Sequence, residues 1–451
     1  MTRVAVVGGG LAGVSAALRL ADRGLAVTLL ESRARLGGVA GSFRRGELDV
    51  DTGQHVFLRC CAAYRGFLDR IGAAEDVTLQ ERLDIPVLAP DAPPARLRRS
   101  GLPAPLHLAG ALLRYRHLPP FARLSLARAA LALGRVDRES ADDRSFGEWL
   151  AAHGQDARAV DVLWDVVGIA TLNARAGDAS LALAATVFQV GLLAEAAAGD
   201  IGWARVPLGA IHDEAATRAL RAAGVEVRRS AKAGTPERTE HGWRVPVAAE
   251  EETVVDRIVC AVPPGAAERL LPPGAVPFGV GWAERLGSTP IVNVHVVYDR
   301  PVLTGPFAAG VDSPVQWVFD RTAQSGAAAV YGPRAQYLAV SLSAADDLVG
   351  LPAQELRDRF LPALAALLPA AREATVLESF VTREPHATFR GAPGQAALRP
   401  GPRSGCRGLY LAGAWTDTGW PATMEGAVRS GEAAAEALLV DRAVAPMGAA
   451  A

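Results

Sequence analysis

Apolar runs alternate with helical patterns at the N-terminal end of the chain. Residues 3–7 predict a buried strand, residues 11–21 a helix of small and apolar side chains, and residues 26–30 a second strand. This order is typical of a right-handed βαβ unit. Near the other end, residues 408–412 predict a short strand and residues 424–439 an alanine-rich helix, so both ends are expected to belong to one domain.

The pattern between these ends changes twice, which predicts a second domain inserted into the first. Residues 207–262 return to a helix and strands, including one strand over 254–262. Strands dominate from 291 to 382, with one helix at 353–368. This second stretch is expected to form a mixed or antiparallel sheet.

Composition and charge narrow the class of protein. A chain of 451 residues is long enough for two domains, and its formal net charge of -1 provides no field for nucleic acid, so no nucleic-acid partner is expected. Cys60, Cys61, Cys260 and Cys406 lack the spacing of a metal site, and the N-terminus lacks a secretory pattern. Reduced thiols and a cytoplasmic location are therefore expected.

Two apolar segments raise the question of a membrane. Residues 181–198 are interrupted by Gln189 and Glu195, so they predict a buried helix lining a pocket rather than a span. Residues 102–135 predict a basic, proline-punctuated helical segment with arginines among leucines and alanines. This segment either makes peripheral contact with a membrane or covers the core as a solvated helix pair, and both interpretations stay open.

The first strand runs into a glycine loop, residues 8–13, with the sequence GGGLAG. Gly8 permits a sharp bend, Gly10 lets the backbone approach a pyrophosphate, and Gly13 lets the helix pack closely on the strand. Phosphates then lie at the N-terminus of the helix. The residues predicted to bind a nucleotide here are Gly8, Gly10, Leu11, Ala12 and Gly13.

Glu31 follows the second strand, where its carboxylate can accept hydrogen bonds from ribose hydroxyls. A 2′-phosphate prefers arginine at this point, so FAD or NAD remains. The continuation contains a basic residue and a glycine pair, an extension that NAD-specific dehydrogenases do not need. It favours FAD, with predicted contacts from Glu31, Ser32, Arg35, Gly37, Gly38 and Val39.

With this extension the sequence resembles the flavoproteins of the amine oxidase and phytoene desaturase superfamily. Residues 408–427 are similar to its second flavin motif, in which a strand delivers a loop to the ribityl chain and a helix points its N-terminus at the isoalloxazine ring. There the amides and the positive helix end can stabilise an anionic reduced flavin. The resemblance places at the cofactor Ala233, beside the adenine, and Gly413, Ala414, Ala422, Thr423 and Met424.

The resemblance implies an α/β fold class: a Rossmann-like FAD-binding domain, split in the sequence, with an inserted α+β substrate-binding domain. The expected FAD-binding parts are 1–80, 205–270 and 401–440. The substrate domain is expected to have a helical part at 81–204 and a sheet part at 271–400.

Within the superfamily the sequence most resembles the hydroxysqualene dehydroxylases, flavoproteins of bacterial hopanoid pathways. The segments that carry this resemblance are spread over the chain, at 51–55, 290–295, 315–320, 382–389 and 420–426. It implies reductive removal of the hydroxyl of hydroxysqualene, giving squalene and water, with hydride from reduced FAD. The implied partners are an apolar isoprenoid bound by burial and an unidentified electron donor for FAD.

The leaving hydroxyl needs a proton. His55 is the first candidate acid, because relatives place its segment near the flavin and the ordinary pKa of histidine, about 6.5, suits proton donation. Asp417, next to the second flavin motif, is the second candidate. Two simpler roles stay open: His55 as a hydrogen-bond partner of the backbone or flavin, and Asp417 as the cap of a turn.

Three other functions stay open. A carotenoid-type desaturase or isoprenoid oxidase would use the same FAD domain to remove hydride, and an amine oxidase would want an aromatic cage and a lysine near the flavin. A carrier or scaffold without FAD would fit two departures from the family, since relatives often have aspartate where Ala414 stands and arginine where Val39 stands. Asp417 is the candidate to supply the ribityl hydrogen bond that Ala414 is unable to make.

Overall fold

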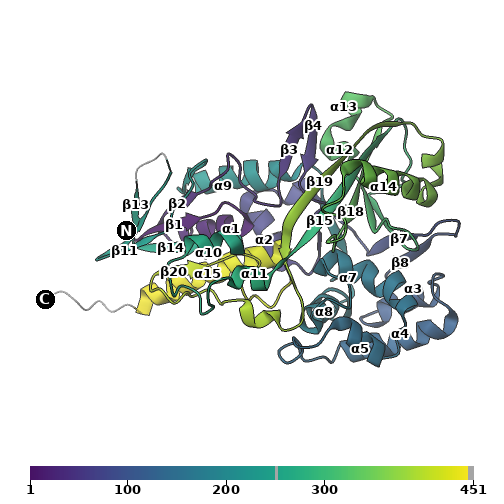
Figure 1. Cartoon of the computed structure of the whole chain (residues 1–451), viewed down its shortest axis with the longest axis horizontal. Helices are drawn as coiled ribbons and strands as arrows, with labels where there is room; N and C mark the ends of the chain where they lie inside the picture. Colours follow the sequence, from purple (N-terminus) through teal and green to yellow (C-terminus); the bar gives the residue numbers. More distant parts are fainter. Residues whose placement is uncertain (249–251, 445–451) are drawn as a thin grey trace.

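The computed structural model describes residues 1–248 and 252–444 (Figure 1). One of its two main sheets has five strands, all parallel. In spatial order they are β10 (Glu226–Arg228), β2 (Ala26–Leu30), β1 (Arg3–Val7), β14 (Arg257–Cys260) and β20 (Leu409–Leu411). Segments from the start, middle and end of the chain therefore build one sheet, and the predicted α/β class is confirmed.

Two long helices from opposite ends of the chain pack beside this sheet (Figure 1). They are α1 (Leu11–Ala21) and α15 (Met424–Val444). A Cβ on Gly431 would lie 2.1 Å from the carbonyl oxygen of Ala12, so glycine is required where the two helices touch. The same domain contains α2 (Ala62–Ile71) and α9 (Ala216–Ala222).

The second main sheet is mixed, as predicted, because one of its pairings, β16 with β7, is parallel and the others are antiparallel. Val292, Val294 and Val296 pack with α14 (Ala353–Leu367) on one face. In spatial order the strands are β19 (Val376–Phe389), β15 (Ser288–Tyr298), β18 (Gln336–Leu342), β17 (Trp317–Asp320), β16 (Phe307–Gly310), β7 (Asp84–Leu88) and β8 (Ala95–Arg98).

Helices gather below this sheet in Figure 1, apart from the parallel sheet. These are α3 (Ala109–Leu113), α4 (Pro120–Leu133), α5 (Phe146–Ala152), α6 (Ala157–Ala159), α7 (Asp165–Leu172) and α8 (Leu181–Phe188). Smaller helices elsewhere are α10 (Pro264–Leu270), α11 (Trp282–Leu286), α12 (Thr322–Ser325) and α13 (Ala327–Tyr331). Among the described residues, no helix is both long and apolar enough to cross a bilayer.

Three small sheets complete the fold. They contain β3 (Ser42–Arg45) and β4 (Leu48–Asp51); β5 (Val56–Leu58), β6 (Val77–Leu79) and β9 (Ile201–Ala204); and β11 (Glu237–Thr239), β12 (Gly242–Val245) and β13 (Thr253–Val255).

Two sequence predictions need correction here. The predicted strand 254–262 is two strands in different sheets, β13 and β14, separated at Asp256. Asp256 bonds the backbone of Arg3 through both its side chain and its own amide, which turns the chain into register with β1. The stretch 81–204, predicted as helical, also contributes the strands β7, β8 and β9.

Candidate functional site

The glycine loop between β1 and α1 excludes side chains at two positions. Gly8 has a φ of +109°, and a Cβ there would lie 2.5 Å from the carbonyl oxygen of Ala261. A Cβ on Gly13 would lie 1.8 Å from the carbonyl oxygen of Gly8. Gly10 differs, because a Cβ there would meet no protein atom within 4 Å. The backbone of the loop thus packs tightly on the protein at Gly8 and Gly13, and it leaves free space beside Gly10.

The N-terminus of α1 lies beside this free space, since Gly10 is the N-cap of the helix. Val14 is the first residue of the helix to donate an internal hydrogen bond, to the carbonyl of Gly10 at 2.9 Å. The amides of Leu11, Ala12 and Gly13 precede it, and the first amides of a helix have no partner inside it. These N–H groups, with the positive end of the helix dipole, form an anion site of the kind that holds a pyrophosphate.

Glu31 lies directly after β2 and is buried, with 8% of its surface exposed. Its Oε2 accepts a hydrogen bond from the amide of Gly9 at 2.7 Å. Its Oε1 accepts from the amide of Arg33 at 2.7 Å and from Ser32 Oγ at 3.1 Å. Because each carboxylate oxygen has two lone pairs, Oε2 keeps one for a ribose hydroxyl. Ser32 acts through Glu31, since its own side chain is exposed.

The turn after Glu31 lies on the glycine loop. The amide of Gly37 donates to the carbonyl of Gly9 at 2.9 Å, and both Gly37 and Gly38 have positive φ values, +92° and +60°. The Arg35 guanidinium donates to the carbonyl of Gly38 at 3.2 Å. The side chain of Val39 is 39% exposed. Arg35 thus places a positive charge on the turn that contains Val39.

Ala233 ends a segment that runs beside Glu31. The amide of Ala231 donates to the carbonyl of Glu31 at 2.9 Å, and the amide of Ser230 to that of Arg33 at 3.0 Å. Ala233 then pairs with Val247 in an isolated bridge and is partly buried. Ala233 therefore lies two residues beyond Ala231, the residue that bonds the end of β2.

The second flavin motif meets the glycine loop at Val262. Gly413 has a φ of +137°, and its amide donates to Ser430 Oγ at 2.8 Å. Trp415 Nε1 donates to the carbonyl of Val262 at 2.9 Å. A Cβ on Gly8 would lie 3.2 Å from the Val262 side chain. Two segments about 400 residues apart in the sequence therefore contact the same residue.

Arg399 organises the loop of the second motif, and the sequence did not predict this role. It is 7% exposed, and its guanidinium donates to the carbonyl of Thr416 at 2.7 Å, of Trp420 at 2.9 Å and of Trp415 at 3.3 Å. The guanidinium also lies 4.5 Å from the ring centroid of Phe389. Arginine suits this position because one planar group can bond several carbonyls at once.

The start of α15 follows this loop. Thr423 Oγ1 accepts from the amide of Gly426 at 3.1 Å and caps the helix. Met424 is buried, whereas Ala422 is partly buried. Glu425, another residue with no predicted role, accepts from the amide of Tyr64 at 2.7 Å and so fixes the start of α2 to the start of α15.

Asp417 lies at the surface, in the turn that follows Gly413. It is exposed, and its carboxylate accepts from the amide of Gly419 at 3.3 Å across a surface turn. The structure thus places it as the cap of a turn, the simpler of its two expected roles.

His55 lies next to a pocket between β5 and the second main sheet. Its Nδ1 lies 3.0 Å from the carbonyl oxygen of Gly53. Since a carbonyl only accepts, Nδ1 carries the proton in the neutral ring and Nε2 is the free acceptor. Burial lowers the pKa of His55 below its ordinary 6.5, against opposing effects of the Gly53 bond and the charge of Asp51. At neutral pH His55 is therefore mostly uncharged.

This pocket is small, with a cavity volume of about 10 Å³, and its lining mixes aromatic with polar and charged residues. The aromatic residues with large rings are Trp203, Phe307 and Phe319. Gln54 also lines it, and the Oε1 of this residue is buried without a hydrogen-bond partner among the described residues. A buried acceptor without a partner is costly, so it calls for a donor, either a water or the hydroxyl group of a bound molecule. Gln54 belongs to the motif 51–55, but nothing in the sequence alone singles it out.

Asp51, from the same motif, joins the two domains. It forms an ion pair with Arg321, which follows β17, and only 4% and 9% of the two side chains are exposed. Asp51 Oδ1 also accepts from Ser42 Oγ at 2.6 Å and from the amide of Leu208 at 3.0 Å. Both Arg321 and His55 line the pocket, so this ion pair holds one wall of the pocket against the other.

His212 supports the turn at Gly37–Ala40 from below. It is fully buried, its Nδ1 lies 2.6 Å from the carbonyl oxygen of Ala40, and its Nε2 lies 2.8 Å from Tyr64 Oη. Burial lowers its pKa to about 4, so the ring stays neutral. It then donates to Ala40 and accepts from Tyr64, which fixes the ring in one orientation.

Taken together, these residues fit FAD. The space above Gly10, the free amides of α1 and the spare lone pair of Glu31 suit a pyrophosphate and a ribose. The start of α15, held by Thr423 and Glu425, adds a second positive helix end in the same domain.

Comparison with known proteins supports this assignment. Residues 11–439 match the model of the family described as flavin containing amine oxidoreductase. The chain is 31% identical to hydroxysqualene dehydroxylase of Rhodopseudomonas palustris, over 97% of this chain and 98% of the relative. It is 28% identical to the enzyme of the same name from Sinorhizobium fredii, with the same coverage of both chains. The zeta-carotene desaturase of Zea mays is 26% identical, over 95% of this chain and 82% of the relative.

Solved structures show the same fold at lower sequence identity. An oxidoreductase from Methanosarcina mazei superposes with a TM-score of 0.72, at 14% identity, over 96% of this chain and 100% of that one. Cyclohexylamine oxidase from Brevibacterium oxydans superposes with a TM-score of 0.68, at 18% identity, over 98% of this chain and 99% of that one.

Proposed function

We propose that this chain, which belongs to the family of flavin containing amine oxidoreductases and is an FAD-dependent oxidoreductase, removes the hydroxyl group of hydroxysqualene to give squalene. The observation that carries the proposal is the match with two hydroxysqualene dehydroxylases over almost the full length of each chain.

The reaction needs one hydride and one proton for each hydroxyl removed. The bond between carbon and the hydroxyl oxygen breaks, the carbon takes the hydride, and the oxygen takes the proton and leaves as water. Reduced FAD, when bound, supplies the hydride and is oxidised. A separate electron donor, an unidentified partner, must then reduce the enzyme again before the next turnover.

Two residues are proposed to handle the substrate hydroxyl. Gln54 Oε1, the buried acceptor without a partner among the described residues, accepts the hydroxyl hydrogen and orients the group. His55, when protonated, donates from Nε2, because Nδ1 is occupied by the Gly53 carbonyl. Burial that lowers the pKa makes the protonated ring a stronger acid but a less populated one at neutral pH.

A pH dependence follows from this role. Because the pKa of His55 lies below 6.5, its protonated form grows as pH falls, so the rate of dehydroxylation should rise from neutral to mildly acidic pH. His55→Gln should lower kcat by about 10²-fold or more and flatten the profile. His153→Gln, at an exposed histidine, should leave both unchanged. An unaltered pH profile in His55→Gln would assign the proton to another group.

The proposal has one rival function, desaturation of a carotenoid-type substrate, favoured by the similarity to zeta-carotene desaturases. Product analysis separates the two. The FAD-loaded enzyme, reduced without oxygen, should convert hydroxysqualene to squalene, and the oxidised enzyme should leave phytoene unchanged. Desaturated phytoene without any squalene would make the chain a desaturase.

We also propose a cytoplasmic location, since the four cysteines are free thiols.

A further inference from the structure

Exposed apolar side chains are concentrated in one segment, residues 101–136. Among the described residues, six of the eight exposed leucine and phenylalanine side chains lie there, with exposed fractions from 49% to 75%. Single exposed leucines are common, but a cluster marks a surface that contacts something apolar. The six are Leu102, Leu106, Leu113, Phe121, Leu124 and Leu131.

Helix α4 is apolar on both of its faces. Its inner face is buried in the core through Ala122, Leu126, Ala129 and Leu133. At 100° per residue, Leu124, Arg128 and Leu131 lie on the opposite side of the helix axis, and Phe121 lies on the flank of this outer face. An exposed helix face is normally polar. The outer face of α4 instead mixes large apolar side chains with one arginine.

The charge of this segment has one sign. Residues 101–136 contain five arginines and no aspartate or glutamate, in a chain whose net charge is only -1. Arg123 is used internally, because it donates to the carbonyls of Leu113 and Leu118. The other four arginines are exposed among the leucines: Arg114, Arg116, Arg128 and Arg135. Exposed leucines mixed with arginines complement the anionic surface of a lipid bilayer.

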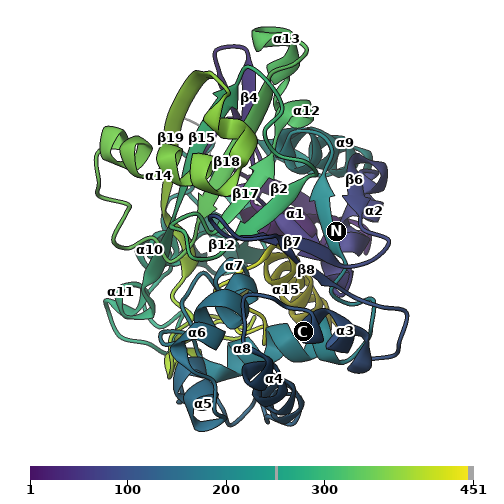
Figure 2. The same ribbon diagram turned by 90° about the vertical axis from the view of Figure 1, so that its right-hand side faces the viewer.

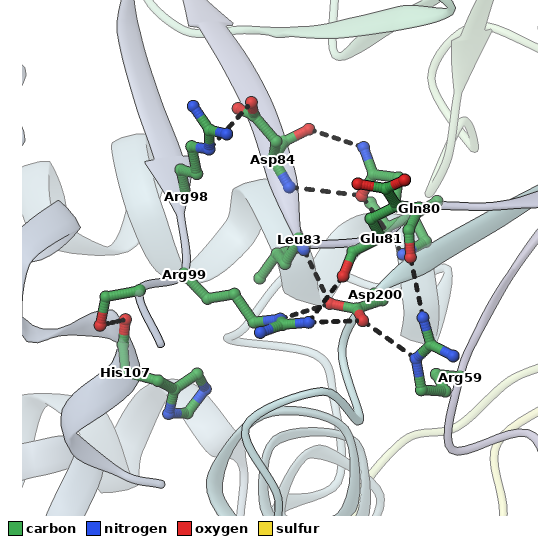
Figure 3. Close-up of polar contacts among 11 residues, drawn as sticks. Arg59, Gln80, Glu81, Leu83, Asp84, Arg98, Arg99, His107 and Asp200 are labelled. Atoms are coloured by element: carbon green, nitrogen blue, oxygen red, sulfur yellow. Dashed lines mark hydrogen bonds and ion pairs between the residues drawn. The ribbon is translucent and has the colours of Figure 1, made fainter. Parts of the chain in front are cut away.

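The segment is fixed to the fold at both ends. Just before it, Arg99 Nε donates to Asp200 Oδ1 at 2.6 Å, and Asp200, which is fully buried, also accepts from Arg59 and from the amide of Leu83 (Figure 3). At the other end, Gln189 Nε2 donates to the carbonyls of Leu133 and Val136 at 2.9 and 2.8 Å. The exposed side chains of residues 101–136 therefore lie on a segment whose two ends are hydrogen-bonded to the rest of the fold.

The position of the segment also suits an apolar substrate. Helices α3 and α4 lie at the edge of the molecule in both views, and Figure 1 shows them apart from the parallel sheet (Figures 1 and 2). The inner face of α4 belongs to the same apolar cluster as Phe307 and Phe319, which line the pocket beside His55. The core beneath this surface is therefore continuous with the proposed reaction site.

We propose that residues 101–136 form a docking surface for an anionic lipid bilayer. Phe121, Leu124 and Leu131 enter the boundary between head groups and acyl chains, while the exposed arginines contact the anionic head groups. The inference concerns binding alone, so it holds or fails whichever isoprenoid the enzyme converts.

Co-sedimentation of the FAD-loaded protein with vesicles tests this surface. The wild type should bind phosphatidylcholine vesicles that contain phosphatidylglycerol, and bind them more tightly at low salt. Phe121→Ser/Leu124→Ser/Leu131→Ser should weaken binding roughly tenfold or more. Arg114→Gln/Arg116→Gln/Arg128→Gln should abolish the preference for the anionic vesicles. The matched control is Leu377→Ser, at a leucine 43% exposed on β19, which should bind like the wild type.

Three results would overturn the proposal. The first is a wild type that does not bind either kind of vesicle. The second is a triple serine variant, with normal flavin content and melting temperature, that binds like the wild type. The third is a self-associated wild type that ignores vesicles and becomes monomeric in the triple serine variant, which would assign the surface to a second copy of the chain.

Discussion

Asp51→Asn is expected to lower the free energy of unfolding of the FAD-loaded enzyme by about 3–5 kcal/mol. The reason is that asparagine leaves the charge of Arg321 buried without a partner between the two domains. The hydrogen bonds from Ser42 and from the Leu208 amide are weakened at the same time. Urea unfolding followed by circular dichroism measures the change.

Asp49→Asn is the matched control, two residues away on the same strand. Its ion pair with Arg44 is exposed, with 34% and 59% of the two side chains accessible, so its loss should cost about 1 kcal/mol or less. Asp51→Asn/Arg321→Met should recover part of the lost stability, because no buried charge remains. If Asp51→Asn is as mild as Asp49→Asn, the buried ion pair does not hold the domains together.

Arg399→Met is expected to give a protein that is purified without its yellow colour and is destabilised by about 3–5 kcal/mol. Methionine fills part of the space but leaves the carbonyls of Trp415, Thr416 and Trp420 without their donor. The loop of the second flavin motif then loses the bonds that fix its shape. The measurements are the ratio of flavin to protein absorbance and the melting temperature.

Two further variants test the role of Arg399: Arg399→Lys is the conservative change, and Arg403→Met is the control at a nearby surface arginine. Lysine keeps the charge but not the planar set of donors, so it should retain only part of the flavin. Arg403 lies four residues away and pairs with Asp441 at the surface, with 52% and 39% exposed, so its loss should leave the flavin in place. Full flavin content in Arg399→Met would show that the loop holds its shape without this arginine.

The parts of the site that the sequence predicted are those with local signals. The bend at Gly8, the close packing at Gly13 and the carboxylate at Glu31 each need a particular residue type at a fixed distance from a strand end. The structure brings these residues together with Gly37, whose amide bonds the Gly9 carbonyl, and with the second flavin motif, whose Trp415 bonds the Val262 carbonyl. Their contact with FAD itself stays a prediction.

The parts that could not be predicted depend on contacts between distant residues. Asp51 meets Arg321 across 270 residues, and Glu425 meets Tyr64 across 361. Arg399 bonds a loop 15–21 residues away, and nothing in its neighbours distinguishes it from a surface arginine. Charged side chains are mostly exposed, so a buried structural role cannot be read from residue type alone.

The fold shows the same division. Helices α1 and α14 were predicted nearly to their ends, because each has a clear apolar period. The predicted strand 254–262 was wrong because its apolar run hides a break at Asp256, which bonds the backbone of Arg3, 253 residues away. Strands β7 and β8 were missed inside a stretch predicted as helical, since short strands compete poorly with helical patterns in a leucine-rich and alanine-rich sequence.

In the proposed reaction this enzyme gives hydride to the carbon that loses the hydroxyl group. A single turnover in D₂O tests it most directly, because the transferable hydrogen of reduced flavin exchanges with solvent. FAD-loaded protein, reduced and kept without oxygen, is mixed with hydroxysqualene, and the product is measured by mass spectrometry. We predict one squalene per flavin oxidised, with one deuterium at the carbon that carried the hydroxyl. Oxidised flavin without squalene, or squalene without that deuterium, would contradict this transfer of hydride.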